Sequence, residues 1–177
     1  SSTRSKGMPI RPLAWGVNQP CNSMNKISQL IPETNLLLNL EASSKKRLFE
    51  QTGLMFENHH GLASSKVFES LFARERLGST GLGAGVAIPH GRIKGLKQAL
   101  GAFVRLAKPL PFDAPDGQPV SLVFFLLVPE HANQEHLELL SELAEMLSDE
   151  RFRDGLNQAP DRSEAHRIMQ GWQPQAA

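Results

Sequence analysis

The stretch at residues 120–128, VSLVFFLLV, is almost continuously apolar. A strand whose two faces are both covered by other elements has this pattern, whereas a strand with one face in water alternates apolar and polar residues. Its uninterrupted part, residues 122–128, is far too short for a helix that spans a bilayer. The stretch therefore predicts the central strand of a layered protein.

The segments around this strand alternate between strand-like and helix-like patterns. Short apolar runs at residues 84–88 and 100–106 predict two further strands. Apolar residues at helical spacing predict five helices, at about residues 43–59, 65–77, 134–147, 150–156 and 163–169. Strands that alternate with helices are typical of a single layered α/β domain.

The length and composition of the chain suit one domain with less regular ends. The chain has 177 residues, of which 40% are hydrophobic and 21% are charged, as in ordinary globular domains. Residues 1–23 contain several prolines and little periodicity, and we expect a flexible arm whose opening residues, SSTRSKG, are an expression remnant. The predicted domain covers residues 24–172, and residues 173–177 form a tail.

Charge and cysteine content argue against several classes of function. A formal net charge of +1 offers no broad attraction to nucleic acid. A single cysteine, Cys21, excludes an intramolecular disulfide and a cysteine-rich zinc site. His131 and His136 are five residues apart, a spacing that does not place them on one helix face as a zinc-binding pair. The start of the chain lacks the layout of a signal peptide, so we expect a cytoplasmic protein that needs no metal and no organic cofactor.

A glycine-rich stretch at residues 78–92, GSTGLGAGVAIPHGR, leads into His90. Glycine-rich loops often surround phosphate, because their backbone N–H groups can approach an anion closely. The stretch is not a P-loop, which needs Gly-Lys-Ser or Gly-Lys-Thr entering a helix, and it lacks the spacing of a dinucleotide fingerprint. The G-x-S-x-G elbow of hydrolases is absent from the sequence. A histidine beside such a loop indicates phosphoryl chemistry instead.

His90 suits the requirements of a phosphoryl acceptor. One neutral ring nitrogen acts as the nucleophile, and the other must donate to a fixed acceptor such as a backbone carbonyl. We expect Gly91 to remove side-chain bulk beside the imidazole. The alternative is a structural histidine at a strand end. A structural role is the interpretation that we favour for the other histidines on polar stretches, His59, His60 and His166.

Residues 73–92, ARERLGSTGLGAGVAIPHGR, resemble the active-site signature of a known family. The family is the fructose/mannitol-type IIA domains of the bacterial phosphoenolpyruvate-dependent phosphotransferase system, and the nitrogen-regulatory variant is the most similar. Further blocks occur in the family's order: SSKKR at 43–47, FDAPDGQPV at 112–120, LLVP at 126–129 and EHLELLSELA at 135–144. The resemblance covers about residues 24–172 and implies a mixed β-sheet flanked by helices.

The resemblance also implies roles for particular residues. The histidine of the AIPHG motif, here His90, accepts the phosphoryl group on Nε2. Arg74 and His136 help to hold the phosphate, which suits a guanidinium able to bind two phosphate oxygens and a histidine in the first turn of a helix. Their structural alternatives are a solvated arginine at a helix end and an ordinary helix-start histidine. The loop supports the phosphate through Ser79, Thr80 and Gly81.

The function that the resemblance implies is that of a phosphocarrier, a phosphotransferase component of the nitrogen-related system. A small HPr-like carrier protein would phosphorylate His90, and the phosphorylation state would regulate target proteins. We expect the carrier to dock near the loop, on Leu82, Val86 and Leu96. Two alternatives stay open: a sugar-specific IIA component that passes the phosphoryl group to a IIB domain, and a protein-binding module that keeps the fold without the transfer.

Overall fold

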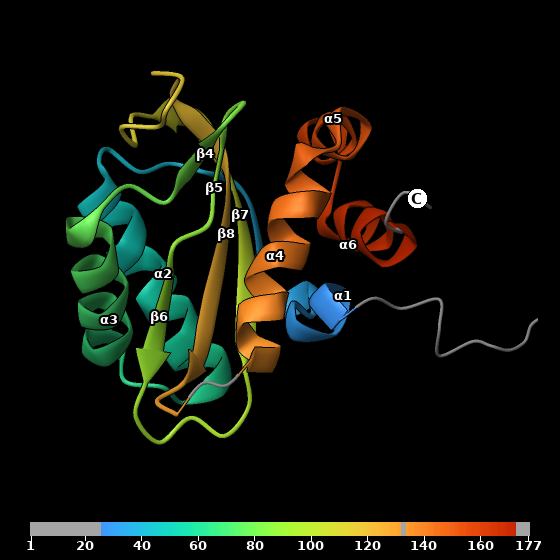
Figure 1. Ribbon diagram of the computed structural model, residues 1–177. Coiled ribbons are helices and arrows are strands. Elements are labelled where there is room, and N and C mark those ends of the chain that lie inside the picture. Colours follow the sequence, from blue (N-terminus) through green and yellow to red (C-terminus); the bar gives the residue numbers. More distant parts are fainter. Residues whose placement is uncertain (1–25, 132–133, 173–177) are drawn as a thin grey trace, which may run out of the picture.

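The computed structural model describes residues 26–131 and 134–172 (Figure 1). The predicted arm at residues 1–23 and the predicted tail at residues 173–177 lie outside the described residues. No helix within the described ranges is both long enough and apolar enough to cross a membrane.

A six-stranded mixed sheet forms the centre of the fold, with the order β3-β7-β8-β5-β4, and β6 also pairs with β8. β8 runs antiparallel to β7 and parallel to both β5 and β6, so the predicted central strand and mixed sheet are confirmed. The edge strand β3 pairs in parallel with β7. The strands are β3 (Leu36–Leu40), β4 (Gly81–Gly83), β5 (Val86–Ala87), β6 (His90–Ile93), β7 (Leu100–Leu110) and β8 (Val120–Pro129).

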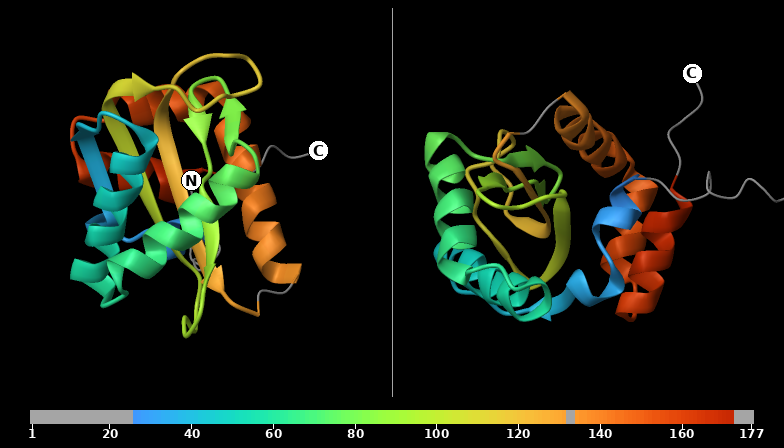
Figure 2. Two further views of the ribbon diagram at one scale, coloured as in Figure 1. Left: turned by 90° about the vertical axis from the view of Figure 1, so that its left-hand side faces the viewer. Right: turned by 90° about the horizontal axis from the view of Figure 1, so that it is seen from below.

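The helices cover the two faces of this sheet in separate layers (Figures 1 and 2). One layer contains α2 (Lys45–His60) and α3 (Ser64–Leu77), which follow each other in the sequence. The other layer contains α1 (Lys26–Leu30), α4 (Gln134–Ser148), α5 (Glu150–Gln158) and α6 (Arg162–Gly171). A short 3-10 turn, η3 (Glu33–Asn35), leads from α1 into β3.

The side chains of β8 divide between the two layers. Phe124 and Leu126 belong to the apolar cluster beneath α4, α5 and α6, whereas Phe125 and Leu127 belong to the cluster beneath α2 and α3. All four side chains are fully buried. Burial on both faces is the physical reason for the continuous apolar pattern of this strand.

Local sequence signals set several of the helix ends. Ser44 caps α2 by accepting a hydrogen bond from the Arg47 backbone N–H at 3.2 Å, and Gly61 ends the helix with φ 71°. Asp149 and Asp161 cap α5 and α6 in the same way, through their side-chain oxygens. These caps explain why the predicted bounds of the helices lie close to the observed ones.

The strand predicted at residues 84–88 is wrong in part, because the chain reverses inside it. Ala84 and Gly85 form the turn of a hairpin between β4 and β5, with φ 57° and φ 82°. Positive φ at both turn residues matches the twist of a two-residue hairpin, which apolar periodicity alone does not reveal. The sequence analysis also missed α1, β3 and β6, and β7 extends four residues beyond the predicted end at 106.

Candidate functional site

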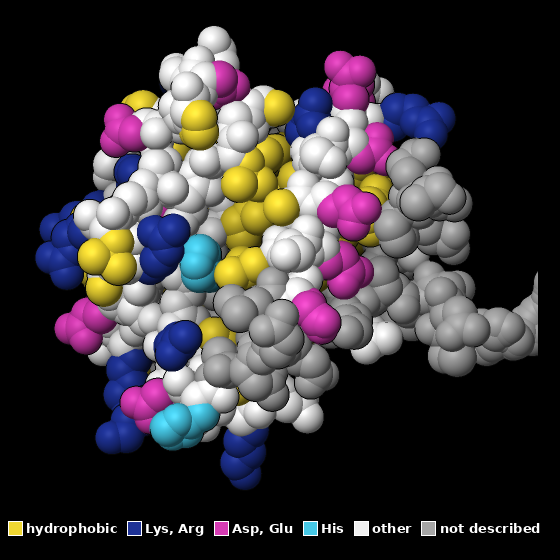
Figure 3. All heavy atoms as spheres, viewed as in Figure 1, with side chains coloured by type: hydrophobic (Ala, Val, Ile, Leu, Met, Phe, Trp, Pro, Cys, Tyr) yellow, Lys and Arg dark blue, Asp and Glu magenta, His cyan; other side chains and the backbone are white. Residues whose placement is uncertain are grey.

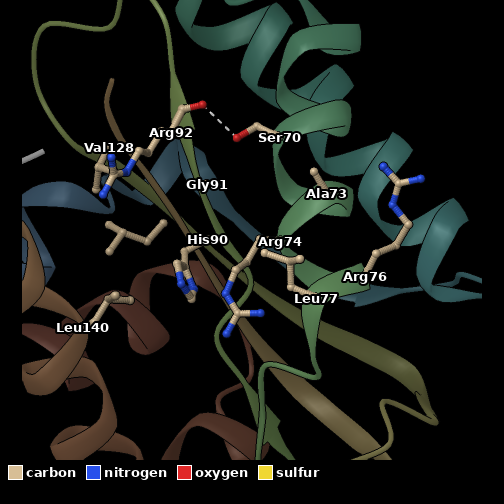
Figure 4. Close-up of a pocket in the computed structure, with 11 residues that line it drawn as sticks. Ser70, Ala73, Arg74, Arg76, Leu77, His90, Gly91, Arg92, Val128 and Leu140 are labelled. Atoms are coloured by element: carbon tan, nitrogen blue, oxygen red, sulfur yellow. Dashed lines mark hydrogen bonds between the residues drawn. The ribbon is translucent and has the colours of Figure 1, made fainter. Parts of the chain in front are cut away.

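His90 is the first residue of β6, where this strand begins to pair with the central strand β8. The Pro89 carbonyl just before it accepts a hydrogen bond from the Leu126 backbone N–H at 3.0 Å. The imidazole is half-buried and lies in a groove between α3 and α4 (Figure 4). The strand pairing therefore fixes the backbone from which the imidazole projects.

The hydrogen bond of the His90 ring defines which nitrogen can react. Nδ1 lies 2.9 Å from the Ile88 carbonyl oxygen. A carbonyl only accepts, so Nδ1 carries the proton and Nε2 keeps its lone pair. This arrangement is the one that a phosphoryl acceptor on Nε2 requires.

The surroundings of His90 keep the imidazole neutral. Burial is the largest cause that lowers the pKa of His90, and the positive charge of Arg74 lowers it further. The hydrogen bond to Ile88 and the negative charge of Glu75 oppose these effects without reversing them. A lowered pKa leaves the ring uncharged, and hence nucleophilic, at neutral pH.

Arg74 lies in the last turn of α3 and reaches the same groove. Its Nη1 donates to the Gly78 carbonyl at 2.8 Å, a bond that uses only part of the five-donor capacity of a guanidinium. Figure 4 shows the guanidinium beside His90, whereas Arg76 extends away from it. The structure thus brings together two of the three predicted principal site residues.

The groove has a volume of about 770 Å³ and is lined by both apolar and basic side chains. Leu126, Val128 and Leu140 supply apolar surface, and the arginines at positions 74, 76 and 92 supply positive charge. In Figure 3, apolar side chains fill the hollow between α3 and α4, with basic side chains on the α3 side and acidic ones on the α4 side. A groove of this kind can receive a protein surface that carries an anionic group.

The predicted phosphate loop also lies beside His90, because Ser79, Thr80 and Gly81 line a smaller pocket of about 210 Å³ together with it. The hydroxyl groups of the loop, however, bind within the protein. The Ser79 hydroxyl donates to the Phe112 carbonyl and accepts from the Gly81 N–H at 3.0 Å. The Thr80 hydroxyl donates to Glu75 at 2.6 Å. Phosphate support by these residues stays a prediction.

His136 is in the first turn of α4, as predicted. Its side chain is not among those that the structure describes. Its backbone is about one turn before Leu140, which lines the groove. The fold therefore brings the start of α4 to the groove, and a role for the His136 side chain stays a prediction.

Gly91 also leaves room for helix α3, whereas the predicted effect beside the imidazole stays a prediction. A Cβ at this position would lie 2.2 Å from Ser70 Oγ and 3.1 Å from the Ser70 backbone carbon. Ser70 Oγ itself donates to the Arg92 carbonyl at 2.8 Å. Glycine is needed here because α3 packs directly on the backbone of β6, a contact that the local sequence does not show.

The predicted docking residues are only partly suited to that role. Leu82 is 44% exposed and lines the smaller pocket beside His90. Val86 is 1% exposed and belongs to the core, so its assignment to a surface is wrong. Leu96 is half-buried and packs against the cluster beneath α2 and α3. The sequence analysis missed Leu77, which is 85% exposed at the end of α3 and lines the groove.

The other histidines assigned a structural role lie elsewhere. His60 Nε2 donates to Asn35 Oδ1 at 3.0 Å, and burial, followed by the charge of His59, lowers the pKa of His60. His59 is exposed at the end of α2, and His166 is half-buried in α6. Among the described side chains, no group of three or more His, Cys, Asp or Glu residues could hold a metal ion.

Comparisons with known proteins identify a matching family and similar solved structures. The family described as "Phosphoenolpyruvate-dependent sugar phosphotransferase system, EIIA 2" matches residues 29–171. A nitrogen regulatory protein of Pseudomonas aeruginosa is 43% identical over 147 residues, which are 82% of this chain and 96% of that protein. The crystal structure of the nitrogen regulatory protein IIA-Ntr from Neisseria meningitidis is 53% identical, with a TM-score of 0.78 over 82% of this chain and 99% of that one. The mannitol IIA structure from Escherichia coli, 22% identical with a TM-score of 0.65 over 78% of this chain and 97% of that one, shares the fold.

Proposed function

The chain belongs to the EIIA type-2 family of the phosphoenolpyruvate-dependent sugar phosphotransferase system, with the nitrogen regulatory proteins among its relatives, and we propose that His90 is its phosphoryl acceptor. In this proposal the chain is a nitrogen-regulatory phosphocarrier that works in the cytoplasm. A small HPr-like protein supplies the phosphoryl group from its own phosphohistidine. The phosphorylated and free forms then bind regulated target proteins differently.

The observation that carries the proposal is the 2.9 Å bond between His90 Nδ1 and the Ile88 carbonyl. The bond selects the tautomer that presents Nε2, and the lowered pKa of His90, caused mainly by burial, keeps the ring neutral. Arg74 supports the proposal as a cation beside the ring that can bind phosphate oxygens. His90 thus supplies the nucleophile, and Arg74 supplies a positive charge for the phosphoryl group that His90 receives.

The transfer follows from these positions. Nε2 of His90 attacks the phosphorus, a nitrogen–phosphorus bond forms there, and the bond to the carrier's imidazole breaks with its electron pair returning to that ring. The Nδ1 proton of His90 stays hydrogen-bonded to the Ile88 carbonyl, which stabilises the positive charge that develops on the ring. Arg74 stabilises the negative charge on the phosphoryl oxygens during a transfer that depends mainly on positioning and electrostatics.

The phosphorylation state changes the surface that a target protein meets. The bound phosphoryl group would place negative charge in a groove lined by Arg74, Arg76 and Arg92 and by exposed apolar groups such as Leu77. A partner that buries this groove therefore experiences different electrostatics in the two states. Such a difference is sufficient to regulate binding without a change of fold.

Intact-mass measurement after incubation with phosphoenolpyruvate, enzyme I and the HPr-like carrier tests the proposal. The protein should gain one phosphoryl group, labile in acid and stable in base, and His90→Ala should abolish the gain while it retains the fold. Phosphorylation of His90→Ala to the same extent would refute the assignment. Onward transfer from the wild-type protein to a sugar-specific IIB domain would assign the chain to sugar uptake instead.

A further inference from the structure

Glu75 is a buried carboxylate that follows Arg74 in the sequence, and it is not one of the residues that line the groove. It is only 7% exposed. Lys45 Nζ lies 3.0 Å from Oε2, the Thr80 hydroxyl donates to Oε1 at 2.6 Å, and the Thr80 N–H donates to Oε2 at 3.3 Å. A buried carboxylate is stable only when it is paired and hydrogen-bonded, and these three contacts meet that need.

The contacts of Glu75 continue through the backbone to His90. The Thr80 carbonyl accepts a hydrogen bond from the Ile88 N–H at 3.0 Å, at the base of the β4–β5 hairpin. The Ile88 carbonyl in turn accepts the bond from His90 Nδ1 at 2.9 Å. Thr80 thus lies between the carboxylate and the residue that holds the imidazole.

We propose that Glu75, acting through Thr80 and Ile88, is a positioning residue that sets the tautomer and orientation of His90. The inference rests on the proposed role of His90 as phosphoryl acceptor. Glu75 accepts hydrogen bonds from both the N–H and the hydroxyl of Thr80, which fixes the hairpin base and aims the Ile88 carbonyl at Nδ1. Nε2 is then directed to the incoming phosphoryl group. Hydrogen bonds to the residues that hold a reactive side chain commonly fix the orientation of that side chain.

Lys45 completes the support from the other helix of the layer. Its ammonium pairs with Glu75 and lies 4.9 Å from the centre of the Phe112 ring. Phe112 also receives the bond from the Ser79 hydroxyl on its carbonyl. Two neighbouring loop residues are therefore anchored: Ser79 to the Phe112 carbonyl and Thr80 to Glu75. The Lys45–Glu75 ion pair lies between these two anchors.

Two substitutions remove this support without touching His90. Glu75→Gln keeps the shape of the side chain and removes its charge, and Thr80→Val removes the hydroxyl but leaves the Glu75–Lys45 ion pair in place. Thr80→Ser retains the hydroxyl and should therefore retain the Nδ1–H form of His90. Thr52→Val is the matched control, because Thr52 is fully buried in α2 and its hydroxyl donates to the Leu48 carbonyl at 2.9 Å.

The ¹⁵N NMR shifts of the His90 ring report the tautomer directly, without any need for turnover. Wild type, Thr80→Ser and Thr52→Val should show the Nδ1–H form, whereas Glu75→Gln and Thr80→Val should show a mixture of both neutral forms. In phosphoryl uptake at saturating carrier, kcat should fall about tenfold in these two variants, as expected for the loss of one hydrogen bond to a charged group. The KM for the carrier should stay within about twofold, because Glu75 and Thr80 are buried.

The outcomes separate this inference from the proposed function. A wild-type protein that takes up no phosphoryl group refutes the proposed function, while the NMR comparison still decides whether Glu75 positions the ring. Normal uptake by wild type together with an unchanged His90 tautomer and kcat in Thr80→Val overturns the inference. If Glu75→Gln fails to fold, the comparison of Thr80→Val with Thr80→Ser and Thr52→Val still shows whether the Thr80–Glu75 hydrogen bond positions His90.

Discussion

The two walls of the groove, on α3 and on α4, are attached to the sheet in different ways. The α3 wall, formed by Ser70, Arg74 and Leu77, has a directional bond to the sheet, from the Ser70 hydroxyl to the Arg92 carbonyl, in addition to the apolar packing of its helix. On the α4 wall, Leu140 lines the groove and Ala144 lines the smaller pocket beside His90, and their helix is held by the apolar cluster beneath it. Hydrogen bonds fix positions, whereas apolar packing is non-directional. We therefore expect His90 to depend on the α3 wall for its geometry and on the α4 wall for enclosure.

The largest effect on stability should come from Gly91→Ala, because the new Cβ would lie 2.2 Å from Ser70 Oγ. We expect a loss of roughly 1–3 kcal/mol in the free energy of unfolding, measured by denaturant titration. Gly155→Ala, on the α4 side, is the matched control: its Cβ would meet Ile168 Cδ1 at 3.4 Å, an ordinary contact. In the interior of helix α5 the control should gain up to about 1 kcal/mol. Equal losses in both variants would contradict the difference between the two layers.

Arg74→Ala should slow phosphoryl uptake about tenfold, less than the 10²- to 10³-fold typical of an oxyanion donor, because backbone donors of the loop remain. The loss should be larger at pH 6 than at pH 8. Burial is the main cause of the low pKa of His90, but Arg74 contributes, so its removal raises that pKa and leaves more of the ring protonated in acid. Single-turnover rates between pH 6 and 8 measure both effects. Arg76→Ala, which lines the same groove but extends away from His90, is the control.

His136→Ala tests whether the start of α4 adds more than enclosure. A protonated histidine near the phosphate would assist transfer most at lower pH, so its removal should flatten the pH profile. The expected loss of rate is about threefold at pH 6, the size of effect that one weak ion pair gives. A variant that keeps the wild-type rate from pH 6 to 8 would leave the α4 wall with a purely apolar role.

Leu77→Ser should leave the chemical step unchanged, because it concerns docking alone. Leu77 is 85% exposed on the α3 wall, and we expect its loss to raise the KM for the carrier about threefold with kcat unchanged. Leu54→Ser is the control, since Leu54 is 48% exposed on α2 and does not line the groove. An identical response of the two variants would place the docking surface elsewhere.

Much of the candidate site could be predicted because its signals are local in the sequence. His90 follows a glycine-rich stretch, and Arg74 ends a helix with clear apolar periodicity. Glu75 was not predicted, although it is adjacent to Arg74. Its partners Lys45 and Thr80 come from other segments, and nothing in the sequence shows that a charged residue in a helix is buried. Val86 was misassigned for the converse reason, since exposure depends on what packs against a strand.

The sequence by itself determined the central strand, the layered α/β class, the helix caps and the identity of the candidate nucleophile. Each of these features can be predicted from hydrophobic periodicity, from a cap residue or from a motif of neighbouring residues. Only the tertiary structure decided that residues 81–87 form a hairpin, that Gly91 makes room for α3, and that Glu75 is buried against Lys45 and Thr80. These features depend on contacts between segments whose meeting is set by the burial of the whole core, and no local pattern encodes that.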